Sequence, residues 1–562
     1  MKRIYSVVMS AAFLVAGFQA SAQKRYVEEI FTDADIEVNA GVTFATNIDF
    51  LTSKLTDPAR IFQDLTAIKT ALAMGQPIPS THYNPLDTST KVKVTDIKMD
   101  IYYPKTSVDT SSARPVIIFL HTGNFLPPGI NGNPLGSRND SSAIILCRQW
   151  AKRGFVAISA DYRLGWNPLA TTVQERRGQL LNAVYRSIHD TKRAVIYMRA
   201  DAAASNTYKI DASKIALYGE GTGAYIANAY TTLDKYTEME LQKFLNPLTS
   251  KSYIDTANVG RIDGSGGVLN LYPQSALSSD VTVSVAVGGA LADTSWLEKG
   301  DAPMIAIQCI RDPFAPFDEG TVIVPTTNED VVDVQGANAY IDKAVKLGNN
   351  DVFKNMPNDD VYTKIAREKY GKTYDYIFPA PNDKITVKQN LEGLYAVDIA
   401  AAASLLQNQG APWQWWDPNS AAAKVEVAPG VTAHMAALQT NPDMSPEKGR
   451  RYLDTIQGYI LPRIAISMGY YTTADFVSVQ GLSAINTKVY PNPAKNEMNI
   501  ISNQGVQINR VEILDLNGRV ILSQDAQGNT ATMDVSNLTN GLYVLLVNTN
   551  EGSGTQRIQI LH

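Results

Sequence analysis

Residues 215–230 read IALYGEGTGAYIANAY, and this stretch decides the fold. Its first four residues are apolar and favour a buried strand, and residues 224–230 favour a helix. Between them, glycines alternate with other residues around Gly221. Strand and helix pass close to each other at such a turn, which leaves little room for side chains beside its apex. The stretch therefore predicts a sharp elbow between a strand and a helix.

Similar units lie on both sides of this elbow. Apolar runs at 116–120, 156–160, 281–287 and 304–307 predict further buried strands, and 141–152 and 180–201 predict helices. Strands that alternate with helices are typical of a mostly parallel sheet that is covered on both faces. Before them, residues 27–103 alternate as extended chain around a helical segment at 57–74. Ser445, Pro446 and Glu447 are suited to begin a long helix that closes this α/β body.

Length and composition limit the function classes. A chain of 562 residues suggests two to four domains. The net charge of −5 and the lack of any Lys/Arg-rich block predict no nucleic-acid partner. We expect no metal and no cofactor, because no zinc motif, phosphate-binding loop or dinucleotide fingerprint is present. The two cysteines, Cys147 and Cys309, can form a disulfide after export or remain as two free, buried thiols.

The N-terminus has the features of a cleaved secretory signal. Lys2 and Arg3 precede an apolar run that is too short to span a bilayer. Residues 20–22 then read ASA, which is a signal-peptidase pattern. We therefore expect a signal peptide at 1–22, and no transmembrane segment in the rest of the chain.

The character of the sequence changes after about residue 479. Short strand-like runs with turn residues between them, including Asn517-Gly518, predict a small all-β sandwich at 479–562. This segment contains VYPNPA at 489–494, VEILDLNGR at 511–519 and NGLYVL at 540–545. Together these motifs resemble the C-terminal sorting domain of the type IX secretion system. The resemblance implies that the secretion machinery and its sortase are partners, and that the protein reaches the cell surface or is secreted.

The body resembles the α/β-hydrolase superfamily on its carboxylesterase and lipase side. The elbow is similar to G-x-S-x-G, residues 121–125 (HTGNF) resemble the H-G-G-x oxyanion loop, and residues 161–164 (DYRL) resemble the exit of the next strand. Residues 189–194 resemble the helix before the elbow, and 302–313 the strand that delivers the triad acid. We expect the body at 23–478, with its core at about 94–312 and 445–470 and an insertion at about 313–444.

The expected catalytic residues are only partly present. Position 221 is glycine where the superfamily has its nucleophilic serine, and glycine cannot form an acyl-enzyme. The resemblance places the acid at Asp312 and offers His434 as the candidate base. It places an oxyanion hole at the backbone N–H groups of Gly123, Asn124 and Thr222.

Three functions follow from this pattern. The first is a non-catalytic surface protein with a small ester or carboxylate ligand. The second is an active carboxylic-ester hydrolase with an unconventional nucleophile, for which Thr222 has the nearest hydroxyl. The third is an adhesion or scaffold protein. Three tryptophans at 413–416 either line a ligand site or pack the insertion onto the body.

Overall fold

The computed structural model describes residues 24–324, 329–358, 360–376, 383–399, 409–476, 480–515, 520–550 and 552–562. The expected signal peptide and the Asn517-Gly518 turn lie outside these residues. Contacts divide the chain into a body at 25–477 and a smaller unit at 478–562. The two units are described separately below.

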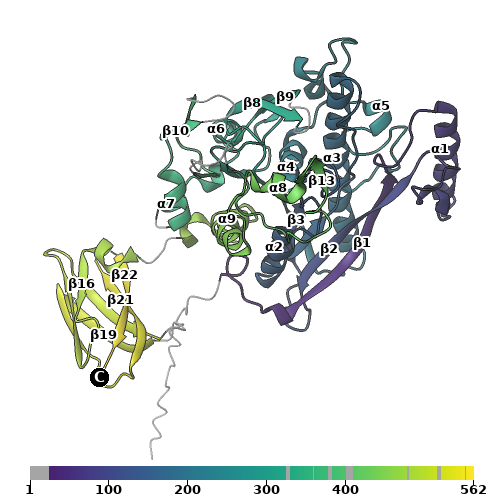
Figure 1. The fold of residues 1–562 in the computed structure, drawn as a ribbon. Coiled ribbons are helices and arrows are strands. Elements are labelled where there is room, and N and C mark those ends of the chain that lie inside the picture. The colour runs from purple at the N-terminus through teal and green to yellow at the C-terminus, as the bar shows by residue number, and fades with distance from the viewer. Residues whose placement is uncertain are drawn as a thin grey trace, which may run out of the picture. The chain divides into compact units, whose positions relative to one another are not determined.

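An eight-stranded sheet forms the centre of the body (Figure 1), in the order β1-β2-β4-β3-β5-β6-β7-β12. Its strands are β1 (Ile36–Ile48), β2 (Val94–Pro104), β3 (Arg114–Leu120), β4 (Val156–Ala160), β5 (Ile210–Glu220), β6 (Val283–Val287), β7 (Met304–Cys309) and β12 (Leu394–Val397). From β4 to β12 neighbouring strands are parallel, whereas β2 is antiparallel to both β1 and β4. The expected mostly parallel α/β sheet is confirmed.

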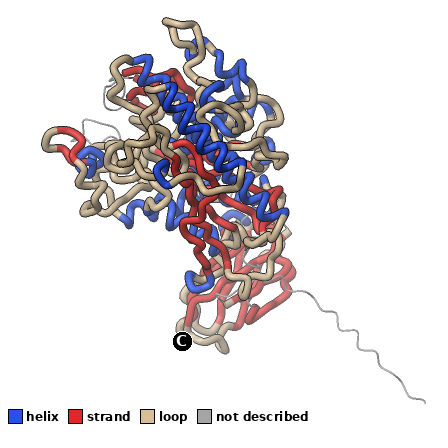
Figure 2. The backbone as a smooth tube through the Cα atoms, turned by 90° about the vertical axis from the view of Figure 1, so that its right-hand side faces the viewer, coloured by secondary structure: helices blue, strands red, loops and turns tan. Residues whose placement is uncertain are grey.

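Helices cover this sheet on both faces (Figure 2). Strand β3 has apolar side chains on both sides, which explains why both faces of the sheet are covered. Val116, Ile118 and Leu120 pack into one apolar cluster, whereas Ile117 and Phe119 pack into another. The first cluster includes residues of α3 (Val173–Ala203), α4 (Thr222–Thr232) and α6 (Ala337–Leu347); the second includes residues of α2 (Ser141–Lys152), α7 (Val361–Arg367) and α9 (Pro446–Ser467). The strand is fully buried, which explains its continuous apolar run.

Among the described residues, three further α-helices and three pairs of short strands belong to the body outside the central sheet. The helices are α1 (Pro58–Ala73), α5 (Thr256–Val259) and α8 (Ala433–Leu438), and the short strands pair as β8 (Glu319–Val324) with β9 (Glu329–Gln335), β10 (Thr373–Tyr376) with β11 (Asp383–Thr386), and β13 (Glu426–Ala428) with β14 (Val431–Thr432). No helix in the described part of the chain combines the length and the apolarity needed to cross a bilayer.

Local sequence signals explain where the helices begin. The side chain of Ser445 accepts the N–H of Lys448 at 3.1 Å, as expected for the first turn of α9. Helix α3 begins seven residues before the predicted start at Leu180, because Thr172 and Glu175 form a capping box ahead of Val173.

One strand of the central sheet comes from the segment expected as an insertion at 313–444. Strand β12 lies parallel to β7 at the edge of the sheet. Its four residues, Leu394–Val397, are too few to show a period in the sequence. The last strand of the sheet thus follows a long chain segment that begins after Asp312 and lies outside the sheet.

The C-terminal unit has two antiparallel-rich sheets around one apolar cluster. One sheet holds β15 (Gln480–Gly481), β22 (Gly552–Ile560), β21 (Gly541–Thr549), β18 (Ile508–Leu514) and β19 (Val520–Gly528), and the other holds β16 (Thr487–Tyr490), β17 (Glu497–Ser502) and β20 (Thr530–Asp534). Buried residues alternate with exposed ones along β17 and β20, as in a sheet with one face in a core. The expected small all-β unit is confirmed.

Candidate functional site

The elbow forms where β5 meets α4. Gly221 lies between them with φ +56° and ψ −118°, a conformation that L-residues adopt only under strain. A Cβ atom on Gly219 would lie 2.0 Å from the carbonyl oxygen of Gly223, and one on Gly223 would lie 2.1 Å from that of Leu120. Both flanking positions therefore require glycine, and the strained backbone of a nucleophile elbow is fully formed.

The space at the apex is filled by a neighbouring loop. A Cβ atom on Gly221 would lie 2.2 Å from Oγ1 of Thr122 and 2.9 Å from its Cβ. The Thr122 hydroxyl thus lies in the volume that a nucleophilic side chain would need. Sequence analysis did not select Thr122, although the signal was present: it stands where the H-G-G-x motif has its first glycine.

The expected oxyanion loop follows β3. Gly123, Asn124 and Phe125 all have positive φ, at 121°, 53° and 57°. For Asn124 and Phe125, which are not glycines, a positive φ is an uncommon and strained backbone conformation. No hydrogen bond among the described residues uses the N–H of Gly123, Asn124 or Thr222. The protein thus supplies no acceptor for these three groups among its described residues.

Aromatic side chains hold this loop in place. The indole of Trp166 donates to the carbonyl of Asn124 at 2.7 Å. The hydroxyl of Tyr162 donates to the carbonyl of His121 at 2.8 Å, and the two rings stack at 4.3 Å. Burial lowers the pKa of His121, so that the ring is neutral. Its Nδ1 is 2.6 Å from the carbonyl of Thr122, a contact typical of a structural histidine.

Asp312 lies beyond the end of β7 and is buried. Its Oδ1 accepts the N–H groups of Phe314 and Ala315 at 2.8 and 3.1 Å. Burial raises the pKa of Asp312 to about 7. A Cβ atom on Gly288 would lie 3.2 Å from the ring of Trp413 and 3.6 Å from Oδ2 of Asp312. The ring of Trp413 and the carboxyl group of Asp312 therefore both lie close to Gly288.

His434 lies in the first turn of α8, where its Nδ1 accepts the indole N–H of Trp416 at 3.0 Å. A triad histidine has the opposite arrangement: its Nδ1–H donates to the acid and its Nε2 accepts the nucleophile's proton. With Nδ1 as acceptor, the neutral ring carries its proton on Nε2. No hydrogen bond joins His434 to Asp312 in the described part of the chain. The structure does not bring these two residues together as a base and its acid.

A second buried carboxyl group connects the elbow to the loop after β12. Oε1 of Glu220 accepts Nε2 of Gln414 at 2.7 Å and Oγ of Ser142 at 3.4 Å. Burial raises the pKa of Glu220 to about 7. The tryptophans beside Gln414 are all buried, which shows that this segment packs onto the body.

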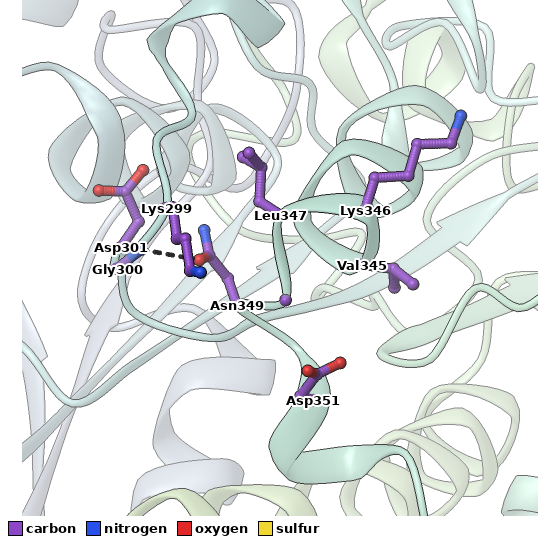
Figure 3. Close-up of a pocket in the computed structure, with 9 residues that line it drawn as sticks. Lys299, Gly300, Asp301, Val345, Lys346, Leu347, Asn349 and Asp351 are labelled. Atoms are coloured by element: carbon purple, nitrogen blue, oxygen red, sulfur yellow. Dashed lines mark hydrogen bonds between the residues drawn. The ribbon is translucent and has the colours of Figure 1, made fainter.

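A shallow surface pocket of about 480 Å³ lies elsewhere (Figure 3). Its walls come from residues 299–301, just before β7, and from residues 345–349 and Asp351 at and after the end of α6. The N–H of Gly300 donates to Asn349 at 2.9 Å and closes part of the wall. Because β5, β6 and β7 are parallel, the amino end of β7 lies at the opposite edge of the sheet from the elbow. The pocket is separate from the candidate site.

Comparison with known proteins gives the following similarities. Esterase 2 of Thermogutta terrifontis phosphorylated by paraoxon is 19% identical, over 40% of this chain and 69% of that chain, with a TM-score of 0.26. The propionate-bound form of that esterase is 17% identical, over 40% and 70%, with a TM-score of 0.27. No curated protein matches the chain.

Two family models match separate parts of the chain. The BD-FAE family of esterase-like α/β-hydrolase domains matches residues 99–324. The family of secretion system C-terminal sorting domains matches residues 488–561. Such a tail engages the type IX secretion machinery and directs a protein to the cell surface or out of the cell. The chain therefore combines an esterase-like α/β-hydrolase domain with a type IX secretion system C-terminal sorting domain.

Proposed function

We propose that the exported hydrolase-like body is a non-catalytic protein that binds the ester or carboxylate group of a small molecule at the elbow. The observation that carries this proposal is the place of the Thr122 hydroxyl, 2.2 Å from where a Cβ of residue 221 would be. Loss of serine alone would leave a space at the apex. Here the space is filled, so that the loop and the apex fit each other without a nucleophile.

The surroundings of Asp312 and His434 support the same proposal. General-base catalysis needs an imidazole nitrogen that is free to accept a proton. Nδ1 of His434 is occupied by Trp416, and no hydrogen bond joins His434 to Asp312 among the described residues. Asp312 itself has two backbone donors and a raised pKa, which is typical of a carboxyl group without a cationic partner.

The N–H groups of Gly123, Asn124 and Thr222 supply the binding chemistry. They are free within the described chain, and Thr222 is the first residue of α4, where the helix dipole adds positive potential. In working enzymes each such donor is worth roughly 3 kcal/mol toward a developing oxyanion. In this protein we assign them to a carbonyl or carboxylate oxygen of the ligand.

A labelling and binding experiment on the mature full-length chain tests this function. We expect no label from a serine-directed fluorophosphonate and no hydrolysis of a short aryl ester. We expect saturable binding of benzoate by calorimetry. Thr222→Pro removes one N–H at a helix position that accepts proline, and should weaken that binding. Thr222→Ala is the matched control, because it loses the same hydroxyl and keeps the N–H.

The outcomes separate the alternatives. Fluorophosphonate labelling of Thr122 or Thr222, together with ester turnover, would show an active hydrolase with an unconventional nucleophile. Equal loss of benzoate binding in Thr222→Pro and Thr222→Ala would show that the N–H group of residue 222 does not contribute to binding. Absence of any ester or carboxylate binding would leave adhesion or scaffolding as the function of the body.

A further inference from the structure

A cluster of basic side chains is buried inside the body, beneath the loop that follows β4. Arg163 is only 2% exposed, and Arg186 and Asp190, on one face of α3, are 3% and 0% exposed. Asp190 accepts Nε of Arg163 with both oxygens, at 2.9 and 3.0 Å, and the backbone N–H of Arg163 at 2.8 Å. The hydroxyl of Tyr272 adds a fourth contact at 2.6 Å. Both oxygens of this carboxylate thus have partners, but only Nε of the Arg163 guanidinium is among them.

Several donors in this cluster have no partner. Both Nη atoms of Arg163 and Nε of Arg186 are buried and make no hydrogen bond among the described residues. The face of Arg163 lies over the ring of Tyr272 at 5.3 Å, and that of Arg186 over Phe50 at 3.8 Å. Ring faces stabilise the guanidinium charge, but the N–H bonds of these three nitrogen atoms lie in the guanidinium plane and remain unpaired.

His189 adds a further unpaired group on the same face of α3. Its ring is fully buried, and neither nitrogen has a well-aligned hydrogen bond, although the Val259 carbonyl lies nearby. Burial, followed by the charges of Arg163 and Lys192, lowers the pKa of His189 well below its usual value. The ring is therefore neutral at pH 7 and offers one N–H without adding charge.

The charges of this cluster do not balance. Arg163 and Arg186 bring two positive charges, and Asp190 brings one negative charge. Burial and the charge of Arg163 lower the pKa of Arg186 to about 9, so it is still cationic at neutral pH. An uncompensated charge inside a protein is strongly destabilising. A monovalent anion next to the unpaired Nη atoms of Arg163 would accept hydrogen bonds from them and offset the excess positive charge.

We propose that Arg163, Arg186 and His189 bind one chloride ion inside the body. The site is separate from the elbow, and the inference does not depend on the proposed function. It connects to the oxyanion loop through Gly165, whose carbonyl accepts Nη2 of Arg186 at 2.6 Å and whose N–H donates to Phe125 at 2.9 Å. The ion would therefore stabilise the loop that carries Gly123 and Asn124.

Thermal unfolding of the mature full-length chain tests this site. At constant ionic strength, replacement of gluconate by chloride or bromide should raise the Tm of the body along a saturable curve, because the ion binds the folded state only. In Arg186→Met the curve should become flat. Arg199→Met removes a guanidinium from the same helix outside the cluster, where Arg199 binds carbonyl groups of residues 212, 278 and 280, and should keep the full chloride response.

A bromide-soaked crystal locates the ion directly, even if Arg186→Met does not fold. An anomalous peak in contact with the Nη atoms of Arg163 would support the proposal. Equal Tm values in chloride and gluconate would overturn it. A chloride response that persists in Arg186→Met, or bromide peaks confined to the surface, would also overturn it.

Discussion

A side chain added at Gly221 should destabilise the body by an amount that depends on Thr122. In Gly221→Ser the new Cβ would lie 2.2 Å from Oγ1 and 2.9 Å from Cβ of Thr122, so the loop must move. Overpacking of this kind costs about 1–3 kcal/mol. The positive φ of 56° adds a backbone cost of about 1–3 kcal/mol for an L-residue. We expect the free energy of unfolding to fall by about 2–6 kcal/mol in total.

The double variant separates these two costs. Thr122→Gly removes both atoms that collide with a new Cβ and leaves the Thr122 Cα at 3.6 Å, an ordinary contact. By itself this change should cost about 1 kcal/mol in backbone entropy. In Gly221→Ser/Thr122→Gly the steric part should disappear, which gives a favourable coupling of about 1–3 kcal/mol in a double-mutant cycle. Gly221→Ala is the control, since it carries the same Cβ without a hydroxyl.

Urea unfolding followed by tryptophan fluorescence measures this coupling. All six tryptophans lie in the body, so the signal reports on that unit alone. Purely additive effects of Gly221→Ser and Thr122→Gly would refute the argument that Thr122 occupies the nucleophile's space. We expect weak ester hydrolysis at best from the double variant, because His434 is bound to Trp416. Rapid turnover would show that a competent base is present after all.

Three further predictions concern export, pH and thiols. Deletion of 485–562 should leave a folded body in the periplasm, and its detection at the cell surface by fractionation would contradict this. The folded state raises the pKa of Asp312 to about 7, so it binds this proton more tightly than the unfolded state. The free energy of unfolding should therefore fall as the pH rises from about 4 to about 7. Asp312→Asn should therefore raise the free energy of unfolding at pH 8 by up to roughly 4 kcal/mol and have little effect at pH 4, and equal urea midpoints for variant and parent at pH 8 would disprove it. Cys147 and Cys309 are free and buried, so a thiol reagent should react with neither in the folded protein and with both after unfolding without reductant; recovery of fewer than two thiols would indicate a disulfide.

The sequence predicted the elements whose signals are local. Strand β4 and helix α2 begin and end at the predicted residues, since a continuous apolar run and an amphipathic period each identify one element without its neighbours. The glycines at 219 and 223 predicted the elbow, because only glycine fits where two backbones approach within about 2 Å of a Cβ position. The sorting tail was identified from motifs that lie within one short segment.

The content of the site was decided by tertiary contacts between distant segments. Gly221 and Thr122 are 99 positions apart, and only their approach shows that one residue fills the space left by the other. Strand β12 adds to the sheet through pairing with β7, which its four residues do not signal by themselves. His434 and Asp312 were selected by their order in the chain, but chain order does not determine which partner a ring nitrogen finds. Local periodicity thus determined the framework, whereas hydrogen bonds and packing between remote residues determined the chemistry that the framework holds.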